Sequence, residues 1–98
     1  MKSNAKVDIL LNKIVKDLED AKAKDIQIIN IKNRSALGDY MVIVSGTSSR
    51  HINSIVSNIV RLNKTHILST EGINSTDWLI VDFGDIILNV FKPETRKH

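Results

Sequence analysis

Three aspartates are the side chains with the clearest potential for catalysis. Asp39 precedes an apolar stretch, and Asp82 and Asp85 flank Gly84. Carboxylates on neighbouring strands are the ligands with which nucleotidyltransferases hold two divalent metal ions for phosphoryl transfer. Here Asp82 and Asp85 are three residues apart, and the Asp-x-Asp spacing that places two carboxylates on one strand face is absent. A nucleotidyltransferase-like enzyme that uses Asp39, Asp82 and Asp85 with a divalent metal is therefore the alternative, and a non-enzymatic binding function the main prediction.

Other groups with catalytic or ligand-binding chemistry are sparse. The chain has no cysteine, so it has no disulfide, thiolate metal site or cysteine nucleophile. His51, His66 and His98 are isolated from one another, and none has a carboxylate or a second histidine three or four residues later. The segment 46–49 lacks the Gly-x-x-x-x-Gly-Lys spacing of a phosphate-binding loop and instead predicts a turn with Thr47 or Ser48 as helix N-cap. We predict no metal, no cofactor and no catalytic residue.

Two amphipathic helices would support whatever site exists. Apolar residues recur at helical spacing from Val7 to Leu18, which predicts a first helix ending near residues 22–24. A second stripe runs from Ile52 to Val60 and follows the predicted cap.

Five strands are predicted around these helices. Residues 26–32 are rich in β-branched side chains, and residues 40–45 form an apolar run typical of a central strand buried on both faces. Residues 66–70 form a short strand, and residues 78–83 and 86–91 form a hairpin. The order α-β-β-α-β-β-β predicts an α+β fold: one domain over residues 1–98, with both helices packed on one face of a mixed sheet.

The hairpin predicts a second, uncovered sheet face. Alternate residues share a face, so Leu79, Val81 and Phe83 belong to the core. Two helices cannot cover both faces of such a sheet. The face left open would present Trp78, Ile80, Asp82, Ile87, Asn89 and Phe91. An aromatic and aliphatic patch bordered by carboxylates is typical of a protein-binding hot spot, although Trp78 and Phe91 packing on each other is an equal alternative.

Charge distribution separates the candidate partners. The net charge is +3, yet residues 65–91 contain four acidic side chains and no lysine or arginine. An acidic hairpin would repel a phosphate backbone and attract a basic protein. RNA binding through Arg34, Arg50, Arg61 and Lys64 is the weaker option, with little direct nucleic-acid contact expected. No apolar run is long enough to span a membrane, and no signal segment is visible, so we expect a cytoplasmic protein.

Several motifs together resemble a known family. The segments Asp39–Ile52 and Asp77–Leu88, with Glu71-Gly72 and Pro93–Arg96, strongly resemble the ribosomal silencing factor (RsfS/Iojap) family over residues 5–96. The resemblance implies a fold related to nucleotidyltransferases but without their catalytic carboxylates. It also implies a translational repressor that docks on ribosomal protein fourteen of the large subunit and sterically blocks joining of the small subunit when nutrients are short.

Carried onto this chain, the resemblance and the face pattern together indicate a docking site. We expect Trp78, Asp77, Asp82 and Glu71 to bind the partner, with Ile80 and Phe91 as apolar support. Two departures from the family stand out. Asn89 occupies a position where relatives commonly carry histidine, and the chain stops at His98 without the usual tyrosine and Leu-Glu-x-Leu-Trp tail. A homodimer is one possible assembly, and the missing tail would remove any dimer or partner contact that the tail makes.

Overall fold

A computed structural model describes residues 5–33, 38–72 and 77–93 of the chain. In chain order the elements are α1 (Ala5–Asp20), β1 (Lys24–Asn30), β2 (Tyr40–Ser45), α2 (Ser49–Leu62), the 3-10 helix η1 (Lys64–His66), β3 (Ser69–Glu71), β4 (Trp78–Asp82) and β5 (Ile86–Phe91). The predicted α+β order is confirmed.

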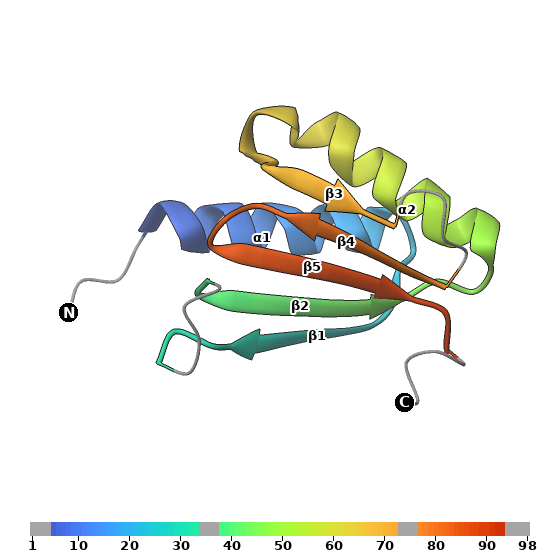
Figure 1. The fold of residues 1–98 in the computed structure, drawn as a ribbon, viewed down its shortest axis with the longest axis horizontal. Helices are drawn as coiled ribbons and strands as arrows, with labels where there is room; N and C mark the ends of the chain where they lie inside the picture. The colour runs from blue at the N-terminus through green and yellow to red at the C-terminus, as the bar shows by residue number, and fades with distance from the viewer. Residues whose placement is uncertain (1–4, 34–37, 73–76, 94–98) are drawn as a thin grey trace.

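The five strands form one mixed sheet in the order β1-β2-β5-β4-β3. The neighbouring strands β2 and β5 run parallel, and the other three pairings are antiparallel. In Figure 1 the sheet is seen with β3 uppermost and β1 lowest, and α1 passes behind the strands. The parallel pair joins segments that are far apart in sequence, since Tyr40 is paired with Ile86.

Both helices pack on the same face of the sheet, as predicted. The buried side of α1 runs from Val7 to Leu18, and that of α2 runs from Ile52 to Ile59. These residues meet the alternate side chains of the three central strands, and all of the following are at most 1% exposed: Val42, Val44, Leu79, Val81, Ile86, Leu88 and Val90. The core therefore lies between the helices and the sheet, and it fixes which side chains point the other way.

The loop from β2 to α2 is held by the predicted cap. The Ser48 side chain accepts a hydrogen bond from the His51 N–H at 3.0 Å. His51 Nδ1 in turn accepts from the Thr47 N–H at 2.9 Å, which leaves Nε2 to donate to the Ala21 carbonyl at 2.9 Å. This histidine therefore ties the start of α2 to the end of α1 and has a structural role.

Several predicted boundaries differ from the structure. The first helix stops at Asp20 because Lys22 adopts a left-handed conformation with φ 63°. The first strand begins at Lys24 and ends at Asn30, and it contains a bulge between Lys24 and Gln27. The short strand predicted over residues 66–70 is present but lies later in the chain: residues 64–66 form a 3-10 helix, and the strand is Ser69–Glu71.

Burial of the central strand on both faces is also wrong. The helix-side residues of β2 are buried, but Met41 and Ile43 on the opposite side are only half-buried. Among the described residues, no helix covers that side of the sheet.

Candidate docking surface

The uncovered side of the sheet forms a continuous surface across all five strands, which we call the open face. Strand register places its residues in three cross-strand rows, headed by Trp78, Ile80 and Asp82 on β4. The rows continue on β5 and β2, and they reach β3 and β1 at the sheet edges. The open face consists of Met41, Ile43, Ser45, Trp78, Ile80, Asp82, Ile87, Asn89 and Phe91, flanked by Lys24, Gln27 and Ile29 on β1 and by Ser69 and Glu71 on β3.

Trp78 is the most prominent apolar side chain of the open face. It stacks on Phe91 with ring centroids 5.3 Å apart and an interplanar angle of 19°. Its indole N–H donates to Asn89 Oδ1 at 3.2 Å. The residue nevertheless remains 45% exposed. The sequence offered two alternatives, packing on Phe91 and presentation to a partner. The structure shows the packing on Phe91, and it leaves enough of Trp78 exposed for presentation to a partner to stay a prediction.

The predicted acidic residues occupy three different environments. Glu71 is exposed on β3, beside Ile80 in the register. Asp82 Oδ1 accepts from the Gly84 N–H at 2.7 Å and thereby holds the hairpin turn. Asp77 Oδ1 lies 3.6 Å from Lys92 Nζ, so a cation just beyond the hairpin partly offsets its charge. Sequence reasoning missed this pair, although Lys92 lies directly after the last strand.

Asn89 departs most from its predicted position. We expected it to be presented on the surface, but it is only 6% exposed, because it lies between Ile80 and Ile43 in the register and bonds to the Trp78 indole. Its Nδ2 atom is buried and has no hydrogen-bond partner. The open face thus has a polar residue at its centre, beneath an apolar surround.

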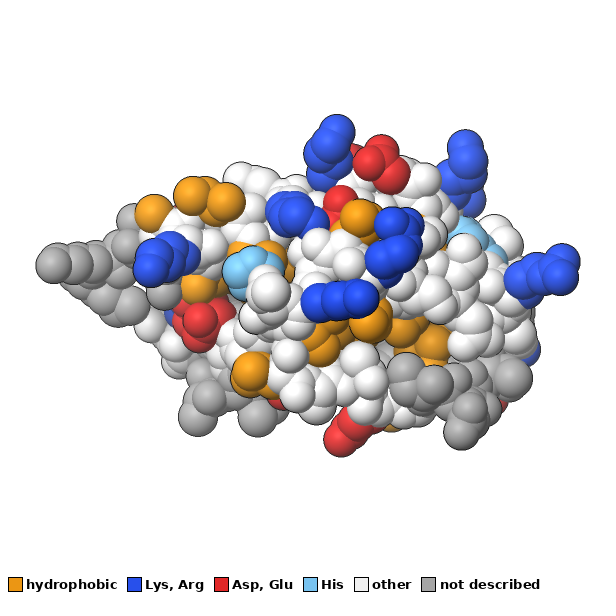
Figure 2. Space-filling model, turned by 90° about the horizontal axis from the view of Figure 1, so that it is seen from above, with side chains coloured by type: hydrophobic (Ala, Val, Ile, Leu, Met, Phe, Trp, Pro, Cys, Tyr) orange, Lys and Arg blue, Asp and Glu red, His pale blue; other side chains and the backbone are white. Residues whose placement is uncertain are grey.

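Basic side chains belong mainly to the opposite layer. Arg50 and Arg61 lie on α2 and Lys64 lies on η1, and Arg61 Nη2 donates to Asn58 Oδ1 at 3.0 Å. Figure 2 shows lysine and arginine side chains spread along the face that is seen from above, with acidic side chains among them. The fourth residue of the RNA-binding option, Arg34, lies outside the described residues. The basic residues of the RNA-binding option that the structure describes therefore lie in the helical layer, away from the open face.

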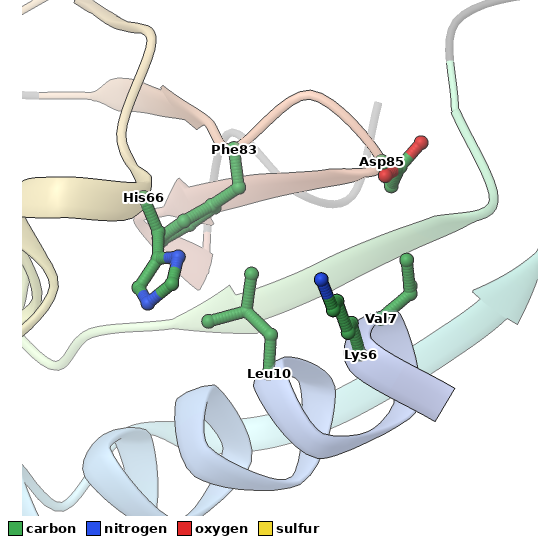
Figure 3. Close-up of a pocket in the computed structure, with 6 residues that line it drawn as sticks. All are labelled: Lys6, Val7, Leu10, His66, Phe83 and Asp85. Atoms are coloured by element: carbon green, nitrogen blue, oxygen red, sulfur yellow. The ribbon is translucent and has the colours of Figure 1, made fainter. Parts of the chain in front are cut away.

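A separate cleft of about 270 Å³ lies between α1 and the β4–β5 turn. Figure 3 shows that Lys6, Val7 and Leu10 line it from α1, opposite His66, Phe83 and Asp85. The cleft is at the helical layer and shares no residue with the open face.

The three aspartates of the alternative enzyme are not brought together. Asp85 lines the cleft, whereas Asp82 belongs to the open face and caps the turn. Asp39 contacts Asp85 through the backbone, where its N–H donates to the Asp85 carbonyl at 2.7 Å. Within residues 5–33, 38–72 and 77–93, no group of three histidine or acidic side chains is placed to hold a metal ion.

No helix in the described part of the chain is both long enough and apolar enough to span a membrane.

Comparison with solved structures identifies close neighbours of the fold. A protein from Bacillus halodurans superposes with a TM-score of 0.84 and 26% identity, covering 92% of this chain and 87% of that one. A protein from Chromobacterium violaceum gives a TM-score of 0.80 and 27% identity, covering 87% of this chain and 73% of that one.

Sequence comparison gives the same grouping. The ribosomal silencing factor RsfS of Zymomonas mobilis is 34% identical over 92 residues, which cover 91% of this chain and 69% of that protein. Mouse mitochondrial assembly of ribosomal large subunit protein 1 is 37% identical over 100 residues, and this chain spans 42% of its length. Residues 3–98 match the family described as ribosomal silencing factor during starvation. The chain therefore belongs to the ribosomal silencing factor family.

Proposed function

We propose that this protein represses translation by binding the large ribosomal subunit through the open face and sterically blocking its association with the small subunit. The partner we propose is ribosomal protein fourteen of the large subunit, as the family resemblance implies. The observation that carries the proposal is the half-exposed Trp78 on an uncovered apolar sheet face.

The composition of the open face suits a protein partner. Binding energy at protein interfaces is concentrated in a few aromatic or arginine anchors surrounded by residues that exclude water. Trp78 supplies such an anchor, Phe91 stacks on it, and Ile80 and Ile87 add half-buried apolar surface in the next two rows of the open face. A polar rim is supplied by Glu71 and Asp82. This arrangement of apolar centre and charged border is the usual anatomy of a protein–protein interface.

The carboxylates at the border of the open face support a basic partner. Proteins that contact ribosomal RNA are generally basic, so a face bordered by carboxylates attracts them and disfavours direct contact with phosphate. The basic residues of α2 and η1 lie on the other layer, away from the proposed contact. The name of the mouse relative refers to the large ribosomal subunit, in agreement with the proposed partner. We propose a non-enzymatic, cytoplasmic role on this basis.

Subunit joining can be measured directly. Purified small and large subunits are mixed, and light scattering follows their association while the protein is titrated in. We expect the association amplitude to fall as the protein saturates the large subunit, and the protein to sediment with the large subunit alone. Full association in the presence of saturating protein would overturn the blocking function, and absence from the large-subunit fraction would overturn the partner.

A further inference from the structure

Asn89 is the one polar side chain at the centre of the apolar part of the open face. Its cross-strand neighbours are Ile80 on β4 and Ile43 on β2, and it is 6% exposed. Its Nδ2 group is buried without a partner. A buried donor that lost its water and gained no acceptor destabilises a fold, so an apolar residue here would give a more stable sheet. The amide therefore calls for a role other than stability.

The contact that Asn89 does make is with the proposed anchor. The Trp78 indole N–H is a donor only and requires an acceptor, which identifies the amide oxygen as the atom that faces it at 3.2 Å. We propose that Asn89 is a positioning residue, which fixes the Trp78 indole in the orientation required for docking. This inference rests on the proposed function of the open face.

Two contacts of the indole bear on its orientation. Stacking on Phe91, at 5.3 Å and 19°, restricts the plane of the ring. The hydrogen bond to Asn89 restrains the edge of the ring that carries the N–H. A side chain ordered before binding loses less conformational entropy when the partner arrives, which raises affinity without any direct contact by the positioning residue.

A positioning role and a purely structural role make opposite predictions for the same variant. Asn89→Leu removes the acceptor and also removes the unpaired buried donor. If Asn89 serves positioning, this variant keeps or gains stability towards urea while it loses affinity for the large subunit. If Asn89 serves the fold, stability and affinity fall together.

The sequence provides a specific probe, because Trp78 is the only tryptophan in the chain. Its single indole N–H resonance reports hydrogen exchange at this contact alone. In the full chain with Asn89→Leu we expect indole exchange at least about tenfold faster, and affinity for purified large subunits about three- to tenfold weaker, the range for freeing one large side chain. Asn89→Ala removes the acceptor without added volume and is expected to show the same two changes.

Rescue and control variants complete the experiment. Asn89→His restores an acceptor through a ring nitrogen, and we expect slow indole exchange and affinity within about twofold of the wild type. Asn53→Leu makes the same chemical change at an exposed position on α2 and should alter neither quantity.

The outcomes separate this inference from the proposed function. Wild-type affinity in both Asn89→Leu and Asn89→Ala overturns the positioning role, and so does unchanged indole exchange in these two variants. Trp78→Ala is measured alongside them. If Trp78→Ala binds weakly while the Asn89 variants bind normally, the open face stands as the docking site and only the positioning role is refuted. If Trp78→Ala binds normally, the docking site itself is refuted.

Discussion

Truncation of Trp78 to alanine tests the open face with a magnitude that follows from its exposure. A fully exposed tryptophan side chain has roughly 250 Å² of surface. The 45% exposed fraction therefore leaves on the order of 110 Å² for a partner to cover. At about 25 cal/mol for each Å², the lost burial is worth about 2.8 kcal/mol, or about a hundredfold in the dissociation constant.

The same truncation also affects the isolated protein, and the two effects must be separated. Trp78→Ala removes the stacking on Phe91, which is worth about 1 kcal/mol beyond the area buried. The remaining core lies on the other side of the sheet, so we expect a folded domain with a lower unfolding free energy. Urea denaturation, monitored by circular dichroism, measures this loss of unfolding free energy. Binding is then compared without denaturant, under conditions where both proteins are fully folded.

The assay is co-sedimentation of the full chain with purified large subunits over a range of protein concentrations. Ile9→Ala is the matched control, because Ile9 is 69% exposed but lies on α1, in the helical layer. We expect this control to bind as the wild type does. If Trp78→Ala loses less than about threefold in affinity, or if Ile9→Ala loses as much, apolar burial at the open face is not what holds the complex together.

Three further predictions concern charge and packing. Glu71→Lys combined with Asp77→Lys should slow association with the large subunit severalfold at low salt and have little effect near 0.5 M salt, where charges are screened; equal rates at low salt in a stopped-flow experiment would remove the electrostatic argument. Gly46→Ala should lower the unfolding free energy by about 1–3 kcal/mol in urea titrations, because an added Cβ would lie 2.7 Å from Ile52 Cγ1; an unchanged midpoint would show that the loop relaxes freely. His51→Ala removes the hydrogen bond to Thr47 within the loop and the one to the Ala21 carbonyl at the end of α1, and should cost about 1–2 kcal/mol, without weakening subunit binding once the protein is folded; a loss of binding in the folded variant would place the loop in the interface.

The parts of the fold that depend on local periodicity could be predicted from the sequence. The alternation of side chains along residues 78–91 assigned each side chain of the hairpin to the correct face. The apolar stripes located both helices, and the predicted N-cap located the start of the second. These features depend on neighbours within a few residues, so the sequence alone contains them. The bounds of the short strand within residues 64–70 were not predicted correctly, because a short apolar stretch has no period long enough to distinguish a strand from a helical turn.

The properties that arise from distant pairing could not be predicted. Asn89 is buried partly because Ile43 lies beside it, and that neighbour comes from a strand elsewhere in the chain. The alternation of side chains places Asn89 on the open face, but it does not predict how far the neighbouring side chains bury it. The division of the three aspartates between the cleft and the open face likewise depends on the turn held by Asp82.

The central position of β5 has a consequence for how the surface comes into being. This strand bridges β2 on one side and β4 on the other, so a nascent chain interrupted before Ile86 holds two unconnected strand pairs and no assembled face. Such non-local pairing makes folding slower than in proteins of mainly local contacts. If the open face is the docking site proposed above, binding requires that β5 is inserted, and a truncated product that lacks β5 would be unable to bind instead of partially active.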